Sequence, residues 1–467
     1  MKRKMVAAVF ILFAVVAFAG CHDDSDTSDS SDKGQWLGIS ICTGEWVVQG
    51  EKVCYNGFDQ FMIAWSDPRK GTDNYNIYIQ TMNPSGKLLW QNNGNPVCTA
   101  AGSQQSLEMA ADGVYGGVNV VWADERNGTT NSDIYMEQIG LGGDQAWGPN
   151  GVAVCTADGN QLNPKIAPDG EGGAIVAWED QRSGYSTIYA QAVDHLGRTL
   201  WMPNGVALAT NIALNPQIIA DGDGGAIVVW EDYHMGASLI YAQKIDSQGN
   251  IQWAKNGVAV CPAAILQESP RLSTDGAGGA FITWQDYRSG IPQVYFQWVY
   301  YTGGTQFAVE GLRVTQNTIG VQTDPTIVYT GERLSPAVIC WSDDRSSSGF
   351  DIYAQKVDLS GNLLWGDEGV PVCTATGDQM SPNMVYGIGS STASIIWEDY
   401  SSGTADYMVY TQKLDDNGKS TLEVNGSLIS TAFSTNPGPD IAQGSPNPLI
   451  VWHEDRSDVI GIGLYAK

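Results

Sequence analysis

The chain has 467 residues, of which 51 are Asp or Glu and 24 are Lys or Arg, so its formal charge is −27. This excess of carboxylates leaves nothing to neutralise nucleic-acid phosphates, which excludes a nucleic-acid-binding role. It favours solubility and the binding of cations.

The first 20 residues have the form of a secretory signal. Lys2, Arg3 and Lys4 precede a short apolar run at residues 5–20, and a polar run follows at once, unlike the flanks of a membrane-spanning helix. The ending FAGC resembles a bacterial lipobox. The resemblance implies cleavage before Cys21 and acyl chains on this cysteine; two or three chains would anchor the protein stably. Ordinary secretion, with Cys21 incidental, stays open as the alternative.

Residues 21–34 are predicted to be a flexible tether. The run HDDSDTSDSSDK has five Asp, four Ser and no large apolar side chain, so it cannot bury enough surface to fold. His22 rather than Asp follows the lipid cysteine, which by resemblance to studied bacteria implies the outer membrane. We therefore expect a monomeric protein of the cell envelope, anchored by lipid.

A repeat covers residues 35–467, which we interpret as one domain. Tryptophans recur every 52 to 57 residues, and a tyrosine follows each of them. The tryptophans are Trp65, Trp122, Trp178, Trp230, Trp284, Trp341, Trp397 and Trp452, and the tyrosines are Tyr78, Tyr135, Tyr189, Tyr241, Tyr295, Tyr353, Tyr410 and Tyr465. A period of this length is the signature of a repeat architecture.

The third copy gives the strand pattern of one unit. NPKIAPDG alternates as a strand does, GGAIVAW is a short apolar run, and TIYAQAVD and TLWMPNGVALAT follow after polar turns. No segment has helical periodicity. The sequence therefore predicts an all-β fold, an eight-bladed β-propeller with four antiparallel strands per blade.

The two ends of the repeat complement each other. The last copy stops at GLYAK, after its third strand, whereas WLGISICTG near the N-terminus matches the fourth-strand pattern NGVAVCTA. We expect this N-terminal strand to complete the last blade and close the ring, which removes free sheet edges.

An Asp follows each repeat tryptophan by two residues in seven copies, and an Arg stands two further on in most copies. The Asp residues are Asp67, Asp124, Asp180, Asp232, Asp286, Asp343 and Asp399. A catalytic group is needed once, whereas these recur in nearly every blade. We therefore interpret the Asp as a structural acceptor for loop amides that can also pair with the Arg.

The turn before the fourth strand carries a resemblance to known families. DLSGNLLW, DHLGRTLW and DSQGNIQW resemble the tryptophan-docking motif of quinoprotein-type propellers, and SDDRSSSGFDIYAQKVD is similar to the repeats of TolB-like propellers. Both resemblances imply a propeller rather than an activity. The quinoprotein cofactor pocket has a vicinal Cys–Cys disulfide, which this chain lacks, and we expect no cofactor.

Signals for a metal or a disulfide are sparse. Asp221 and Asp223 in DGDGG resemble part of a calcium loop, although a full loop needs more oxygen ligands and a plain hairpin turn needs no metal. Most cysteines occupy one repeat position, too far apart to bridge. Cys42 and Cys54 are the only pair that we would test for a disulfide.

The sequence favours a non-enzymatic propeller scaffold that binds a partner protein or a glycan. The alternative is a hydrolase or lyase acting on polysaccharide in the central funnel. Such an enzyme should carry a lone acid or His where its sister copies hold something else, and the repeat shows few such breaks. Loop residues that depart from the repeat are the candidate ligand-binding residues, namely Tyr233, His234, Tyr287, Arg288 and Tyr400. Covering of neighbouring loops is the other interpretation of the tyrosines.

Overall fold

The computed structural model describes residues 39–42, 47–71, 74–234, 236–262, 266–332, 337–346, 348–387, 389–400, 407–430, 438–444, 447–455 and 462–466. All regular elements in these residues are β-strands, which form eight four-stranded antiparallel sheets. The signal, Cys21 and the tether lie outside the described residues. Within the described part of the chain, no helix is long and apolar enough to span a membrane.

Each sheet is one blade; in seven blades the strands run outward in chain order, and in the last blade β1 is the outermost strand. The innermost strands are β2 (Gln49–Tyr55), β6 (Gln104–Ala111), β10 (Gln161–Pro168), β14 (Ala213–Ala220), β18 (Gln267–Thr274), β22 (Gln322–Tyr329), β26 (Gln379–Gly387) and β30 (Asp440–Ala442). The second strands are β3 (Phe61–Asp67), β7 (Val118–Asp124), β11 (Ala174–Asp180), β15 (Ala226–Asp232), β19 (Ala280–Asp286), β23 (Ala337–Asp343), β27 (Thr392–Asp399) and β31 (Leu449–Asp455). The third strands are β4 (Asn76–Met82), β8 (Asp133–Ile139), β12 (Thr187–Val193), β16 (Leu239–Ile245), β20 (Gln293–Val299), β24 (Asp351–Val357), β28 (Met408–Leu414) and β32 (Ile462–Ala466). The outermost strands are β5 (Asn95–Cys98), β9 (Val152–Cys155), β13 (Val206–Ala207), β17 (Val258–Ala259), β21 (Leu312–Arg313), β25 (Val370–Cys373), β29 (Ser427–Leu428) and β1 (Ile39–Cys42).

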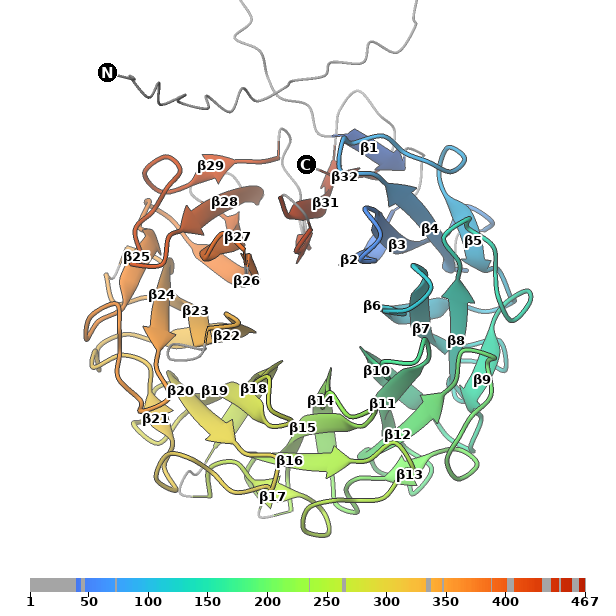
Figure 1. Cartoon of the computed structure of the whole chain (residues 1–467), viewed down its shortest axis with the longest axis horizontal. Helices are drawn as coiled ribbons and strands as arrows, with labels where there is room; N and C mark the ends of the chain where they lie inside the picture. Colours follow the sequence, from blue (N-terminus) through green and yellow to red (C-terminus); the bar gives the residue numbers. More distant parts are fainter. Residues whose placement is uncertain are drawn as a thin grey trace, which may run out of the picture. The chain divides into compact units, whose positions relative to one another are not determined.

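The blades are arranged in a ring around a central axis (Figure 1), and a cavity lined by the innermost strands lies at this axis. Each innermost strand contacts the innermost strand of the next blade, and β30 of the last blade contacts β2 of the first. The fold is therefore the all-β, eight-bladed propeller that the repeat predicts. The sheet of β30, β31 and β32 includes β1 at its outer edge, with Ile39 opposite Ala466 and Ser40 opposite Tyr465.

Hydrophobic side chains between adjacent blades hold the ring together. The second strands are apolar on both faces because neighbouring blades cover both sides, and β11 and β15 are buried along their whole length. One cluster joins Ile175 and Ala177 of β11 to Val228 and Trp230 of β15. All eight repeat tryptophans are fully buried, so each blade places a large aromatic ring at an interface between blades.

A second set of tryptophans contacts the following blade near the outer strand in five copies; they are Trp90, Trp147, Trp201, Trp253 and Trp365. The Trp201 indole donates a hydrogen bond to the carbonyl of Ser247, at 3.1 Å, in the following blade. Its ring lies on Gly249, where an added Cβ would be 2.7 Å from the ring and the φ angle is +84°. Only glycine fits both restraints without strain, which explains why the motif keeps a Gly before the Trp.

The seven described cysteines are thiols, and the structure forms no disulfide between Cys42 and Cys54. Burial raises the pKa of the Cys54 thiol to about 12, so it stays protonated at neutral pH. These cysteines act as small buried residues.

Candidate functional site: the central channel

The repeat Asp and Arg form a closed hydrogen-bonded unit inside five of the blades. In the third blade, Asp180 accepts hydrogen bonds from the Trp178 indole at 2.8 Å and from the Arg182 backbone amide at 3.0 Å. The Arg182 guanidinium binds both carboxylate oxygens, at 2.7 and 2.6 Å, and lies 4.0 Å from the centre of the Tyr189 ring. Both carboxylate oxygens of Asp180 thus accept hydrogen bonds from its own loop and strand. They are not available to bind a ligand.

Two of the candidate binding residues belong to this same unit. His234 replaces the Arg of the fourth blade, where its ring contacts the Asp232 carboxylate and lies edge-on to Tyr241 with the ring centres 5.3 Å apart. Arg288 binds both oxygens of Asp286, at 2.7 and 2.6 Å, and covers the Tyr295 ring. Both side chains therefore make their contacts within their own blades.

The other three candidates lie in different surroundings. The Tyr233 hydroxyl donates to the Glu231 carboxylate at 3.0 Å, and Glu231 lines the central channel. Tyr287 is hydrogen-bonded to Glu268 of β18, so it lies beside the innermost strand of its own blade. Burial and this hydrogen bond raise the pKa of Tyr287 to about 12. Tyr400 instead packs against Tyr407 at 5.4 Å.

In the DGDGG turn, the Asp221 carboxylate is bound by groups of the protein itself. Asp221 accepts hydrogen bonds from the backbone amides of Asp223 and Gly225, both at 2.8 Å, and pairs with Lys244 at 3.1 Å. Among the described residues, no three His, Cys, Asp or Glu side chains are grouped so that they could hold a metal ion. A hairpin turn accounts for this segment.

A ring of polar side chains lines the channel at one position of the innermost strands. It is the position that pairs with the residue before each repeat tryptophan, and we call its eight residues the channel ring. They are Lys52, Glu108, Lys165, Gln217, Arg271, Thr326, Asn383 and Asp440. The eight blades carry seven different residue types at this position, and only Lys occurs twice. The positions next to it carry similar residues in most blades.

A bulge in each innermost strand places a second set of polar groups above the ring. The residue two before each ring residue has a positive φ angle of 46 to 62°, and in six blades it is not glycine. Such a conformation is uncommon for Ser, Asn or Asp and marks a register shift in the strand. Because the feature occurs in all eight blades, it belongs to the architecture, but it presents the side chains of Ser106, Asn163 and Asn215 to the channel mouth.

Glutamates of the second strands hold these bulges in place. Glu231 accepts hydrogen bonds from the Asn215 side chain at 2.9 Å and from the Ser269 backbone amide of the next blade at 2.8 Å. Glu179 makes the corresponding contacts to Asn163 and Asn215, at 3.1 and 2.9 Å. The mouth is therefore pre-formed by contacts between blades.

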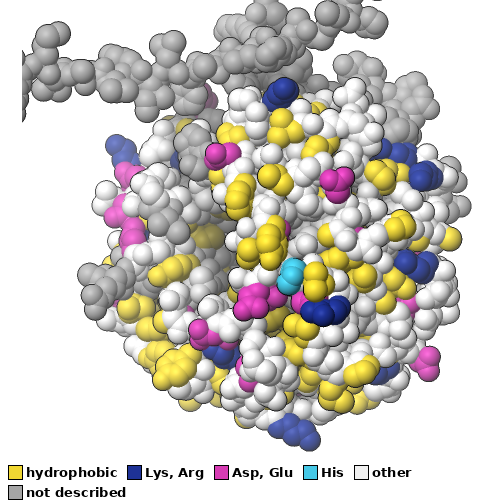
Figure 2. Space-filling model, turned by 45° about the vertical axis from the view of Figure 1, so that its right-hand side comes forward, with side chains coloured by type: hydrophobic (Ala, Val, Ile, Leu, Met, Phe, Trp, Pro, Cys, Tyr) yellow, Lys and Arg dark blue, Asp and Glu magenta, His cyan; other side chains and the backbone are white. Residues whose placement is uncertain are grey.

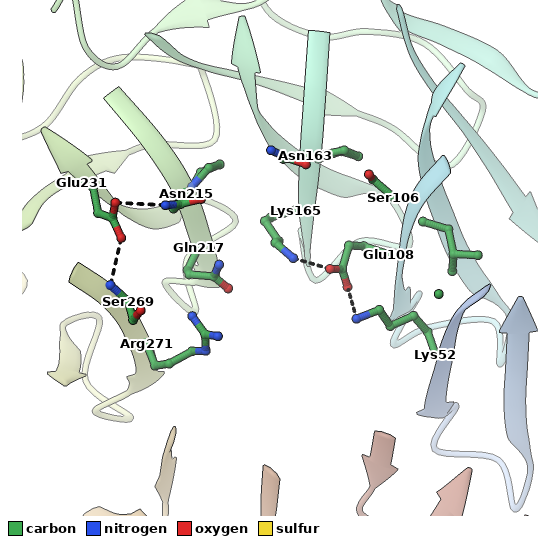
Figure 3. A pocket seen from close by; sticks show the side chains of 14 residues that line it. Lys52, Ser106, Glu108, Asn163, Lys165, Asn215, Gln217, Glu231, Ser269 and Arg271 are labelled. Carbon is green, nitrogen blue, oxygen red and sulfur yellow. Dashed lines mark hydrogen bonds and ion pairs between the residues drawn. The ribbon is translucent and has the colours of Figure 1, made fainter. Parts of the chain in front are cut away.

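The charges of the ring are unevenly distributed. Lys52 and Lys165 both contact the Glu108 carboxylate, and the first of these contacts is 3.4 Å long (Figure 3). Burial raises the pKa of Glu108, but the two ammonium groups outweigh burial and hold this pKa below its ordinary value. Arg271 lies across the same cavity, which has a volume of about 490 Å³. Three cations and two carboxylates, Glu108 and Glu231, thus line this side of the channel, although the chain as a whole is strongly acidic.

The sequence analysis missed the channel ring. The expectation of few breaks in the repeat was wrong for this position, because it rested on the conserved-looking Trp, Asp, Arg and Tyr positions. The signal was present in the sequence: the residue four after the Gln in QLNPK, QESPR and QMSPN is polar and changes from copy to copy. Its meaning depended on knowing that the first strand of each unit faces the axis.

Comparisons with known proteins assign no family to the chain. No protein-family description and no curated protein matches the sequence. Among solved structures, the chain is similar to an ulvan lyase of polysaccharide lyase family PL25, with 11% identity, a TM-score of 0.49, and coverage of 92% of this chain and 95% of that one. It is similar to the Dos1 propeller, with 11% identity, a TM-score of 0.47, and coverage of 92% and 94%. An acylaminoacyl peptidase of Pyrococcus horikoshii matches at 10% identity, with a TM-score of 0.43 and coverage of 88% and 59%.

Proposed function

We propose that this protein is a lipoprotein of the bacterial cell envelope that binds a glycan at the mouth of its central channel. The observation that carries the proposal is the channel ring, where the eight copies differ at one inward-facing position while the surrounding framework repeats. A position kept only for the architecture would carry the same residue type in most blades, as the repeat Asp does.

The chemistry of the mouth suits a sugar. Its cavity of about 490 Å³ lies in the usual range for small-ligand sites, roughly 300–1,000 Å³, and is too small to receive a folded protein. Ser106, Asn163, Asn215 and Gln217 offer hydroxyl and amide groups that both donate and accept hydrogen bonds, as sugar hydroxyls require. Tyr233 beside Glu231 adds an aromatic ring near the rim.

The exterior offers a weaker case for a protein partner. Figure 2 shows hydrophobic, acidic and basic side chains scattered over the face in view rather than gathered by kind. Single exposed apolar side chains are normal on a monomer. This favours the channel over the face in view as the place of recognition.

The test is a glycan array probed with the full chain, followed by substitutions that fill or spare the channel. Gln217→Trp puts a large ring into the channel and is expected to abolish glycan binding. Leu196→Trp is the matched control, since Leu196 is 57% exposed in a turn between the third and fourth strands, away from the innermost strand. Binding that survives Gln217→Trp at an unchanged melting temperature would move the site elsewhere, and a protein that binds no glycan would end the proposal.

A second candidate function is cleavage of the bound polysaccharide. It is favoured by the phenol of Tyr233, which hydrogen-bonds a carboxylate at the mouth and so has a proton acceptor within reach. Incubation of a bound glycan with the protein, with assays for new reducing ends and new unsaturated ends, separates a hydrolase, a lyase and a binding protein.

A further inference from the structure

Arg271 differs from the other described arginines because its guanidinium bonds no other side chain. Arg69, Arg126, Arg182, Arg288 and Arg345 each bind the repeat Asp of their own blade. Arg198 pairs with Asp194, and Arg313 donates to Gln293 and to a backbone carbonyl. In the part of the chain that the structure describes, Arg271 donates only to the carbonyl of its neighbour Pro270, at 3.0 Å, and no carboxylate oxygen lies within 4.0 Å. Its side chain is exposed within the channel.

Two of the carboxylates near Arg271 are already occupied, and a third, Asp324, attracts the guanidinium without forming an ion pair with it. Glu231 accepts three hydrogen bonds, from Asn215, Ser269 and the Tyr233 hydroxyl. Glu108 is shared by Lys52 and Lys165. The guanidinium therefore points into the cavity with most of its donors unused, as Figure 3 shows.

Gln217 lies beside Arg271 and also has unused hydrogen-bond donors. It is the channel-ring residue of the preceding blade, it lines the same cavity, and its amide forms no hydrogen bond with another described residue. Because both side chains are accessible from the cavity, solvent or a ligand can supply the acceptors that their spare donors lack.

We propose that the channel selects an acidic saccharide, whose carboxylate or sulfate group binds the Arg271 guanidinium while its hydroxyl groups bind Gln217 and the amide and hydroxyl side chains of the bulges. The inference rests on the proposed glycan-binding function and adds the class of glycan. A planar fork of donors matches two oxygens of a carboxylate or sulfate, and the excess of cations on this side of the ring adds attraction that a neutral sugar cannot use.

The charge of the whole chain sharpens this selection. A formal charge of −27 repels anions from most of the surface, so an acidic sugar gains binding only at the cavity, where three cations outnumber the carboxylates Glu108 and Glu231. Weak adsorption of acidic polymers elsewhere is thereby suppressed, and recognition is confined to the channel.

The experiment measures binding by isothermal titration calorimetry with matched probes: trigalacturonic acid, its carboxyl-reduced neutral counterpart, a sulfated carrageenan tetrasaccharide, the acidic and neutral glycans retained on the array, and inorganic sulfate. We expect acidic saccharides to bind at least ten-fold more tightly than neutral ones, with affinity falling as salt rises. The two acidic probes distinguish a carboxylate from a sulfate ester as the recognised group.

Variants assign the preference to Arg271. Arg271→Gln is expected to reduce the preference for acidic saccharides at least ten-fold, and Arg271→Lys to keep part of it because the charge remains. Arg198→Gln is the matched control: Arg198 is 68% exposed on a turn and should leave all affinities unchanged. Since Arg271 has no carboxylate partner, neither of its variants should lower the melting temperature.

The outcomes separate the two proposals. Equal binding of acidic and neutral saccharides, both lost in Gln217→Trp and both unaffected by Arg271→Gln, overturns the inference and leaves the glycan site standing. Tight binding of inorganic sulfate with no binding of any saccharide overturns both. Acidic preference that persists in Arg271→Gln also overturns the inference, because another group then supplies it.

Discussion

Glu137 is a single-residue departure with consequences for pH. Six other copies have Gln at this position, namely Gln80, Gln191, Gln243, Gln297, Gln355 and Gln412. The Gln191 amide donates to the Met202 carbonyl at 2.8 Å, whereas Oε2 of Glu137 is buried and has no hydrogen-bond partner among the described residues. Burial raises the pKa of Glu137 to about 7, and the amides that its carboxylate accepts only partly offset this.

We predict that Glu137→Gln stabilises the protein in a pH-dependent way. The pKa of Glu137 is raised in the folded state from its ordinary 4.5, so the folded protein loses stability as pH rises from about 4.5 through 7. The loss is on the order of 3 kcal/mol at pH 8. The variant should therefore melt higher than the parent at pH 8, and the two should converge at pH 4. Thermal melts at these two values check this; an equal difference at both would contradict it.

Asp180 and Arg182 should behave as a coupled pair. Asp180→Ala leaves the Trp178 indole and the Arg182 guanidinium without their acceptor, at a cost of about 3 kcal/mol. The double variant with Arg182→Ala should cost clearly less than the sum of the single variants, with a coupling of about 1 kcal/mol or more. Denaturant unfolding of the four proteins measures the cycle. Additive losses would mean that the carboxylate serves the indole and the loop amides alone.

At the scale of the element, β1 is the strand whose contribution is most open to test. Ile41 of β1 is buried in a cluster with Phe61 and Trp65 of the first blade, while β1 pairs with β32 of the last blade. Ile41→Ala should lower the free energy of unfolding by about 2–5 kcal/mol, since it removes a buried side chain from this cluster. Ile39→Ala is the control, because Ile39 is 37% exposed. Equal melting temperatures for the two variants would show that β1 contributes little.

The elements could be predicted from the sequence, but the site could not. The second strands were predictable because burial on both faces yields apolar runs such as GGAIVAW, and Trp178 recurs in every copy. The channel ring depends on which edge of the blade faces the axis and on a bulge that shifts the register between Leu162 and Lys165. A bulge changes where side chains point without a strong local signal, so the inward position of Lys165 emerges only in three dimensions.

At the scale of the whole molecule, eight near-identical blades create one asymmetric site. The framework tolerates change at the axis because the hydrophobic clusters lie between the blades, as with Trp178 against the preceding blade, and leave the channel position free of packing constraints. Lys52, Arg271 and Asp440 can therefore stand at equivalent positions without altering the fold. Function in such a ring is expected where the symmetry fails and packing does not decide the residue.

We predict that acylation of Cys21 determines where this ring operates. The ending FAGC before the acidic tether implies acylation of Cys21, and acyl chains hold a protein at a membrane far more firmly than the weak forces available to a chain of charge −27 near anionic lipids. Cys21→Ser should move the protein from the membrane fraction to the soluble fraction and abolish incorporation of radiolabelled palmitate, while glycan binding and the melting temperature stay unchanged. Tyr185→Ala, a substitution on the propeller, is the control and should stay with the membrane. Membrane association that survives Cys21→Ser without palmitate would mean that the signal or another part of the chain holds the protein there.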